Sequence, residues 1–257
     1  MQLIDSHCHI FLQEFDADRN IVVKRAQETG VETLILPNID STTISLLKDS
    51  CDAFPDACKA LLGIHPTSVN DDYKKELKIV EKELERNPNK YIGIGEIGLD
   101  LYWDKTYYKE QIDAFLYQLQ LAKSMNVPVA IHIRNAFDET FEVLRQSGIS
   151  SFKGVIHCFS GNSDQAKQAI DFGFTLGIGG IVTFKKSGID GILSNIDLQH
   201  IILETDSPYL APTPFRGKRN EPSYLKNIAQ KVADIKNVSI DDVAKITTNN
   251  CKTLFQL

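Results

Sequence analysis

The sequence predicts an α/β fold, a single (β/α)8 TIM barrel with one extra C-terminal helix. Eight short apolar runs alternate along the chain with segments of helical periodicity, and six of these runs end in residues able to bind metal. The length of 257 residues is typical of such a barrel. No Pro- or Ser-rich linker and no internal repeat divides the chain, so we expect one domain over residues 1–257.

The predicted strands are rich in Ile, Val and Leu and nearly free of charge, as is typical of strands buried on both faces of a parallel sheet. In chain order they are Leu3–His9, Thr33–Ile39, Ala60–His65, Tyr91–Glu96, Pro128–Arg134, Gly154–Phe159, Phe174–Gly179 and Ile201–Asp206.

Segments with apolar residues every three or four positions lie between these strands and predict helices. They are Asp16–Thr29, Ser41–Ala53, Tyr73–Arg86, Tyr108–Met125, Phe137–Gln146, Ser163–Phe172, a weaker segment Gly188–Asn195, and Tyr224–Ile235. Gly30, Gly148 and Gly173 follow three of them as stop signals. A last helix begins near Ser239, where Asp242 completes a capping-box pattern.

Alternating strands and helices form either a doubly wound sheet or a closed barrel. A nucleotide-binding doubly wound domain usually carries a Gly-rich phosphate loop after its first strand, and this chain has none. Polar residues at the carboxyl ends of six strands favour the barrel, whose active sites lie at that end.

Composition narrows the class of protein. A net charge of −6 and a pI near 5.5 argue against a broad basic surface that coats nucleic acid, although a small local basic site remains compatible with them. Five cysteines without a CxxC pair predict reduced thiols. With no leader and no apolar run long enough to span a bilayer, we expect a cytoplasmic protein without a membrane partner. We also expect the protein to be a monomer.

Five of the six histidines lie at the ends of predicted strands. His7 and His9 are two apart in a predicted strand, so their side chains share a face and can bind one cation. The alternative is a packed or surface pair. His132 and His157 end two successive strands, where either alone would more often be a buried core histidine. Cys8 points the other way and is expected to pack under the helices.

Two carboxylates also close predicted strands. Glu96 ends one within a glycine-rich segment, and a buried carboxylate is costly unless a positive charge or a metal compensates it. Asp206 closes the last strand. Glu204 shares its face and either supports a ligand or lies exposed at the strand edge.

Together these side chains offer more ligands than one tetrahedral metal site can use. Four histidines and two carboxylates fit two divalent cations bridged by a carboxylate, the arrangement with which two-metal hydrolases activate water for displacement at phosphorus. Histidine with carboxylate ligation suits Zn, Mn or Fe, and looser occupancy by Mg is compatible with it.

With these motifs the whole chain resembles the TatD family of metal-dependent deoxyribonucleases, which are TIM barrels of the metallo-dependent, amidohydrolase-like type. The segments that carry the resemblance are Asp5–His9, Gly63–Pro66, Gly95–Asp100, Ile131–His132, His157–Gly161, Glu204–Pro208, Arg216–Pro222 and the terminal Thr248–Phe255. Two departures occur near the cleft. The family often has a small residue, an arginine and an acid after this histidine, and here Ile133, Arg134 and Asn135 occupy these positions. Tyr102 with Trp103 replaces a more usual pair of tyrosines.

The resemblance implies a role for each ligand candidate. His7, His9 and Asp206 would hold one metal, His132 and His157 the second, and Glu96 would bridge them. Asp206 would also orient or deprotonate the attacking water, which makes it and Glu96 the catalytic pair. His65 would contact the substrate phosphate.

Two further groups of residues have open interpretations. Arg216, Lys218 and Arg219 lie in a loop after the last strand and either bind the substrate or form an ordinary solvated loop. The aromatic residues Tyr102, Trp103 and Tyr107 either stack bases or pack locally.

The resemblance implies a divalent-metal-dependent hydrolase of DNA phosphodiester bonds, a 3′–5′ exonuclease on single strands, with RNA as a second substrate. The alternative is an amidohydrolase-type enzyme acting on another ester or a cyclic amide. Many such enzymes have a carboxylated lysine on strand 4, where this chain has Glu96, while Lys90 precedes the strand. A third hypothesis, a catalytically silent scaffold, conflicts with the complete ligand set.

Overall fold

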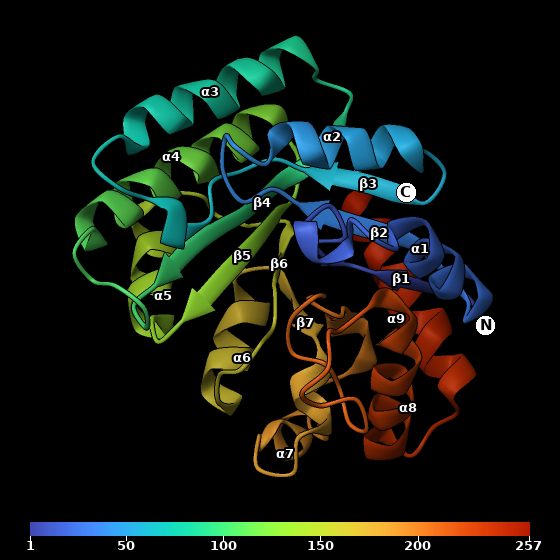
Figure 1. Cartoon of the computed structure of the whole chain (residues 1–257). Coiled ribbons are helices and arrows are strands. Elements are labelled where there is room, and N and C mark those ends of the chain that lie inside the picture. Colours follow the sequence, from blue (N-terminus) through green and yellow to red (C-terminus); the bar gives the residue numbers. More distant parts are fainter.

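In the computed structural model, which describes residues 1–257, eight parallel strands lie in the centre and helices surround them (Figure 1). The strands pair in chain order, and backbone hydrogen bonds from Ser6 N to the Leu203 carbonyl (3.0 Å) and from Asp206 N to the His7 carbonyl (2.9 Å) join the first to the last. The predicted barrel is therefore confirmed. Its strands are β1 (Leu3–Asp5), β2 (Val31–Pro37), β3 (Cys58–Leu61), β4 (Tyr91–Asp100), β5 (Val129–Arg134), β6 (Gly154–Ile156), β7 (Phe174–Ile178) and β8 (Ile201–Leu203).

Several strands end earlier than predicted. β1, β3, β6 and β8 stop before the residues proposed as ligands, whereas β4 continues four residues beyond Glu96 to Asp100. At the carboxyl end of the barrel the short strands give way to irregular segments that no longer pair in a regular ladder. The candidate ligands His7, His9, His65, His157 and Asp206 lie on those segments.

The predicted helices are all present. They are α1 (Arg19–Glu28), α2 (Ile44–Ala53), α3 (Tyr73–Arg86), α4 (Tyr108–Met125), α5 (Phe137–Gln146), α6 (Ser163–Asp171), a five-residue α7 (Ile189–Leu193), α8 (Leu225–Lys236) and α9 (Ile240–Phe255). The stop signals at Gly30, Gly148 and Gly173 have positive φ. Ser239 caps α9 by accepting from Asp242 N (3.0 Å), but the Asp242 carboxylate binds the Ser239 hydroxyl instead of its backbone, so only half of the predicted capping box forms.

The extra C-terminal helix closes one end of the barrel. A cluster of buried side chains fills the barrel interior, and Cys251 and Phe255 of α9 belong to it. Its other members come from the strands: Ile4, Ile35, Leu61, Ala130, Val155 and Ile202. Because α9 covers this end, the site must form at the opposite, carboxyl end of the strands.

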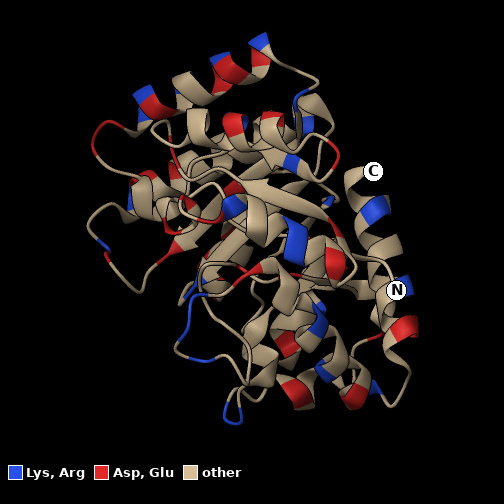
Figure 2. Ribbon diagram, turned by 45° about the vertical axis from the view of Figure 1, so that its right-hand side comes forward, with Lys and Arg blue, Asp and Glu red and all other residues tan.

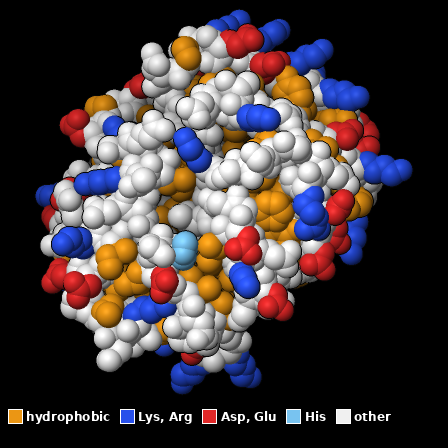
Figure 3. All heavy atoms as spheres, turned by 180° about the vertical axis from the view of Figure 1, so that it is seen from behind, with side chains coloured by type: hydrophobic (Ala, Val, Ile, Leu, Met, Phe, Trp, Pro, Cys, Tyr) orange, Lys and Arg blue, Asp and Glu red, His pale blue; other side chains and the backbone are white.

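The surface carries both signs of charge. Figure 2 shows Lys and Arg interspersed with Asp and Glu on the outer helices, and Figure 3 shows the same mixture on the face seen from behind. All five cysteines are free. None of the helices combines the length and the apolar character needed to cross a membrane.

Gly98 permits the close approach of β4 to β5. Its φ is +138°, and a Cβ there would lie 2.1 Å from the His132 carbonyl oxygen. We expect Gly98→Ala to lower the free energy of unfolding by about 2–4 kcal/mol, measured by urea denaturation. Gly148→Ala is the matched control, because Gly148 has φ +67° but nothing within 4 Å of its added Cβ, and it should cost only about 1 kcal/mol. Equal losses for the two variants would contradict the steric argument.

Candidate metal centre

His132 and His157 point into the barrel because of strand periodicity. Ala130 in β5 and Val155 in β6 belong to the interior cluster, and side chains two residues further along a strand point the same way. His157 lies one residue beyond β6, but its N–H still donates to the Ile131 carbonyl of β5 (3.0 Å), so the alternation continues to it. His132 and His157 therefore extend the interior faces of these strands toward the carboxyl end. Their rings stack with centroids 5.7 Å apart.

The side chains of His7 and His9 converge on one point. The two residues were predicted to lie within a strand, but they lie beyond its end. β1 ends at Asp5, and the following segment lies between β8 and β2, where Cys8 N donates to the Ile35 carbonyl (3.0 Å). These separate backbone contacts replace a regular ladder. They still direct both rings to the same point, with 3.2 Å between the two Nε2 atoms. Cys8 is buried in the outer core, as expected.

Glu96 lies inside β4 instead of at its end, which corrects the predicted strand boundary. The register of β4 against β5 shifts between Ile94 and Ile97, and this irregularity lies at the carboxylate. The two carboxylate oxygens face different histidines. Oε2 lies 3.1 Å from His7 Nε2 and 3.6 Å from His9 Nε2.

The other oxygen of the same carboxylate faces a second set of rings. Glu96 Oε1 lies 2.9 Å from His132 Nδ1, 3.0 Å from His157 Nε2 and 3.3 Å from His65 Nε2. A carboxylate with a separate group of imidazoles at each oxygen has the geometry of a bridging ligand.

Asp206 completes the cluster on the side of His9. Its Oδ1 lies 3.5 Å from His9 Nε2 and 3.9 Å from His7 Nε2. Asp206 follows β8 by three residues with φ +57°, in the left-handed region. Its side chain is 13% exposed, so this oxygen lies nearer to solvent than those of Glu96, which is 3% exposed.

The charges in the cluster depend on one another. Burial alone would raise the pKa of Glu96, but His157, His65 and His7 hold it well below its usual range. Burial alone would lower the pKa of His157, yet Glu96 and Glu204 raise it well above that of an ordinary histidine. For Asp206 the contact with His9, together with His157 and His7, outweighs burial and lowers the pKa. Both carboxylates are thus anionic, as metal ligands must be.

The donor set fits divalent cations. Around an ion with bonds of about 2.0–2.2 Å, neighbouring ligand atoms lie roughly 3–3.5 Å apart, and most of the distances above are in that range. Three groups of side chains have ligand atoms close enough to share an ion: His7 with His9 and Glu96, His65 with Glu96 and His132, and His7 with His157 and Asp206. Glu96 belongs to two of these groups.

Two buried carboxylates hold the histidines from behind. Asp100 Oδ2 lies 2.9 Å from His132 Nε2, and Glu204 Oε1 lies 3.2 Å from His157 Nδ1. Glu204 is fully buried and contacts His157, so the exposed alternative is wrong, and its support of a metal ligand stays a prediction. The role of Asp100 was missed, because β4 was predicted to end four residues earlier.

Glu204→Gln tests this support. The amide keeps the shape but replaces one carboxylate oxygen that faces His157, so we expect metal affinity to fall about 10- to 100-fold. Isothermal titration of chelator-stripped protein with Zn would measure it. His200→Ala removes the histidine that lies outside the cluster and should leave the affinity unchanged. Wild-type affinity in Glu204→Gln would contradict the role.

A further buried acid, Asp5, fixes the backbone beneath the cluster. Its carboxyl contacts the Thr205 hydroxyl (2.5 Å) and accepts from Thr205 N (2.9 Å), and burial raises its pKa to about 8. This contact joins β1 to the segment that carries Asp206. The sequence offered only the position of Asp5 beside His7 as a signal.

His65 lies among the ligand candidates. It follows β3 and precedes a short 3-10 helix (Pro66–Ser68), and its Nδ1 contacts the Thr67 hydroxyl at 2.6 Å. Its Nε2 lies 3.3 Å from both His132 Nδ1 and Glu96 Oε1. A contact to the substrate phosphate stays a prediction, and the position allows a ligand role equally.

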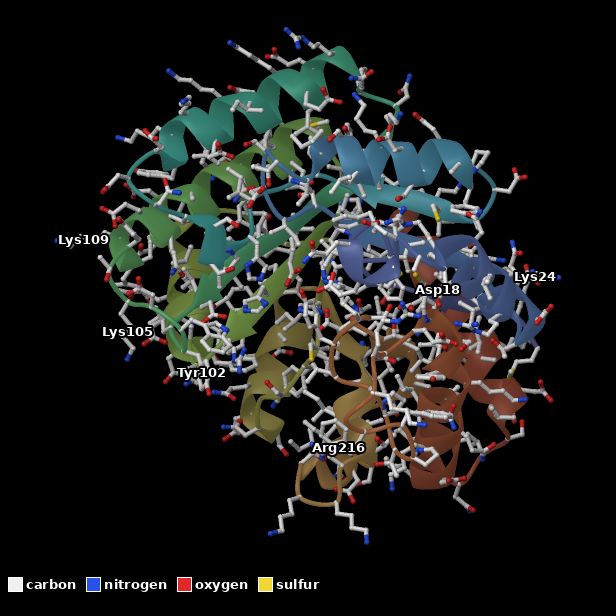
Figure 4. The ribbon with its side chains drawn as sticks, in the orientation of Figure 1. Asp18, Lys24, Tyr102, Lys105, Lys109 and Arg216 are labelled. Carbon is white, nitrogen blue, oxygen red and sulfur yellow. The ribbon has the colours of Figure 1, made fainter.

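The two predicted substrate arginines have protein partners. Arg219 forms a two-point ion pair with Asp18 (2.7 and 2.8 Å) and donates to the Glu14 carbonyl, so its guanidinium links the loop after β8 to the segment before α1. Arg216 is exposed, with its guanidinium 3.8 Å from the centre of the Phe184 ring (Figure 4). Substrate contacts from either residue stay predictions.

Comparison with known proteins gives consistent matches over the full length. The family model described as TatD related DNase matches residues 4–256. YabD of Bacillus subtilis, an uncharacterized metal-dependent hydrolase, is 36% identical over 99% of each chain. The 3′–5′ ssDNA/RNA exonuclease TatD of Pantoea vagans is 31% identical, over 99% of this chain and 100% of that protein. The crystal structure of YjjV, a TatD homologue from Escherichia coli, has a TM-score of 0.93 at 29% identity, over 99% of this chain and 98% of YjjV.

Proposed function

Since the chain belongs to the TatD related DNase family, we propose that this metal-dependent hydrolase cleaves phosphodiester bonds of single-stranded DNA and releases nucleotides from the 3′ end. The observation that carries the proposal is Glu96, whose two carboxylate oxygens face separate histidine groups. That arrangement supports two divalent cations, with Mg, Mn or Zn as the candidates.

The residues divide the chemistry between them. His7, His9 and Asp206 would hold one ion, His132 and His157 the other, and Glu96 both. When bound, the ions supply an activated water and neutralise charge on the phosphoryl oxygens. Asp206 orients the attacking water and accepts its proton, because its carboxylate is anionic and the more exposed of the two.

The class of substrate rests on the relatives and on the ligand set. The Pantoea vagans protein is named as an exonuclease of single-stranded DNA and RNA, which supports DNA as the substrate and makes RNA the second candidate. All ligand candidates come from one chain, so we propose that a monomer is active.

Amide hydrolysis remains the alternative, and one contact counts against it. The amidohydrolase-type enzymes considered above carry a carboxylated lysine on the fourth strand. Here Lys90 precedes β4, and its Nζ lies 2.8 Å from Asp52 at the other end of the strand from the cluster. Glu96 takes the bridging position instead.

Release of nucleotides from end-labelled single-stranded DNA tests the proposal. Chelator-stripped protein would receive Mg, Mn or Zn in turn, with His200→Ala as a control expected to match the wild type. Cleavage that metal restores, and that begins at the 3′ end, would support the proposal. If the protein binds metal but cleaves DNA under no condition, the proposed substrate is wrong, and another ester or an amide becomes the candidate substrate.

A further inference from the structure

Two exposed aromatic rings and one arginine form a group at the rim of the barrel. The Arg134 guanidinium, at the end of β5, lies 3.9 Å from the centre of the Tyr102 ring and 5.1 Å from that of Trp103. The two rings meet edge to face, with centroids 5.0 Å apart. Tyr102 is 53% exposed and Trp103 68%. Tyr102 and Arg216 lie on separate loops of this side of the molecule (Figure 4).

Asp100 connects this group to the metal centre. While its Oδ2 contacts His132, its Oδ1 accepts hydrogen bonds from Tyr102 N (2.9 Å) and Trp103 N (3.2 Å). Arg134 lies two residues after His132 in β5 and therefore extends from the same face of the strand. Asp100 alone thus connects the turn that carries the two aromatic residues to the ligand candidate His132.

Arg134 is positioned by stacking and has no acidic partner. Its guanidinium makes no hydrogen bond or ion pair within the protein, in contrast to Arg219, which Asp18 neutralises. A guanidinium that stacks on an aromatic face keeps its N–H edge available, and this edge matches the two oxygens of a phosphate. Tyr102 with Trp103, a departure noted in the sequence, therefore lies directly against Arg134.

Trp103 also lines a cleft of about 310 Å³, to which neither Tyr102 nor Arg134 contributes. Tyr107 lines it with Trp103, and so do the acidic residues Asp40, Asp100 and Asp104. These acids disfavour a phosphate inside the cleft, whereas the two aromatic side chains can stack on a base and the carboxylates can accept from its amino group.

We propose that Arg134 binds the phosphate next to the scissile bond and that the base of that nucleotide stacks on Trp103 at the acidic cleft. This subsite rests on the proposed function, because it presupposes a polynucleotide at the metal centre. It assigns strand binding to the rim formed by β4 and β5, in addition to the predicted loop after β8.

Trp103 is the sole tryptophan of the chain, so its fluorescence reports on the subsite alone. The metal-loaded protein would be titrated with a phosphorothioate hexadeoxyadenylate, which resists hydrolysis, at several salt concentrations. We expect saturable quenching in the wild type. Arg134→Ala should raise Kd at least 10-fold and reduce the slope of log Kd against log salt by about 0.7, the value for one phosphate contact on a single strand.

Two variants separate charge from geometry. Arg134→Lys keeps the charge but not the planar fork, so its Kd should rise while its salt slope stays near that of the wild type. Arg145→Ala removes an exposed arginine of α5, which pairs with Glu142, and should bind as the wild type does. Anisotropy of a labelled strand provides Kd values independent of Trp103.

The outcomes distinguish the subsite from the function. If the wild type cleaves single-stranded DNA but Arg134→Ala leaves Kd and salt slope unchanged, the subsite is wrong and the function stands. If DNA is bound with the expected Arg134 dependence but never cleaved with any metal, the function fails and the subsite stands. A wild type that neither binds nor cleaves the strand overturns both.

Discussion

Replacing Glu96 by alanine is expected to abolish tight binding of both metal ions and with it all hydrolysis. Each oxygen of this carboxylate faces a different histidine group, so one truncation would remove an anionic ligand from both proposed ion sites. The imidazoles on both sides would also lose their contact with a carboxylate oxygen. Loss of a single ligand elsewhere in the cluster should affect one ion more than the other.

Metal analysis of purified protein after dialysis measures this effect directly. The wild type should retain two ions per chain and Glu96→Ala close to none. Glu85→Ala is the matched control, because Glu85 is an exposed glutamate of α3 and belongs to none of the ligand groups. Glu96→Gln adds a second test, since it keeps the volume of the side chain and removes only its charge. Full metal content in Glu96→Ala would overturn the bridging assignment.

The barrel and the location of its site could be predicted because periodicity and strand ends are local properties. Eight apolar runs and the helices between them are visible in the sequence, and so is the position of His132 or His157 just after a run of buried residues. In a parallel barrel all strand ends meet at one rim, so residues far apart in sequence are brought together without further information.

The boundaries and the supporting residues could not be predicted, because they depend on contacts between distant segments. The regular strand β1 ends at Asp5, before His7 and His9. The segment that carries these histidines is held by separate hydrogen bonds to β2 and to the region of β8, and not by a continuous ladder. Asp100 supports His132 only because β4 continues past Glu96, with a shifted register against β5. Arg219 pairs with Asp18, which is 201 residues away, and the sequence alone does not reveal such a contact.

The carboxylates of Glu96 and Asp206 differ in how deeply they are buried, and this difference determines which of them can reach a water molecule. Glu96 is enclosed by imidazoles on both sides, whereas Asp206 has histidines on one side and partial access to the mouth on the other. A group that takes a proton from water must reach that water. Asp206 meets this requirement better than Glu96, which suits the bridging role.

Asp206→Asn is therefore expected to slow turnover by about 10²-fold or more while the fold and KM remain close to those of the wild type. Asparagine is the suitable replacement because Asp206 has φ +57°, a left-handed conformation that asparagine adopts more readily than most residues. The amide keeps the shape and an oxygen that can still act as a ligand, but it cannot accept a proton from water at neutral pH.

Steady-state kinetics with metal analysis of the same samples would separate the two roles of this residue. Asp171→Asn, an exposed position at the end of α6, controls for the loss of one negative charge. A slow variant that retains both metals supports proton transfer by Asp206, because the ligand set is then intact. A rate that falls only in proportion to metal content would instead show that Asp206 acts as a ligand alone, and an unchanged rate would exclude both roles.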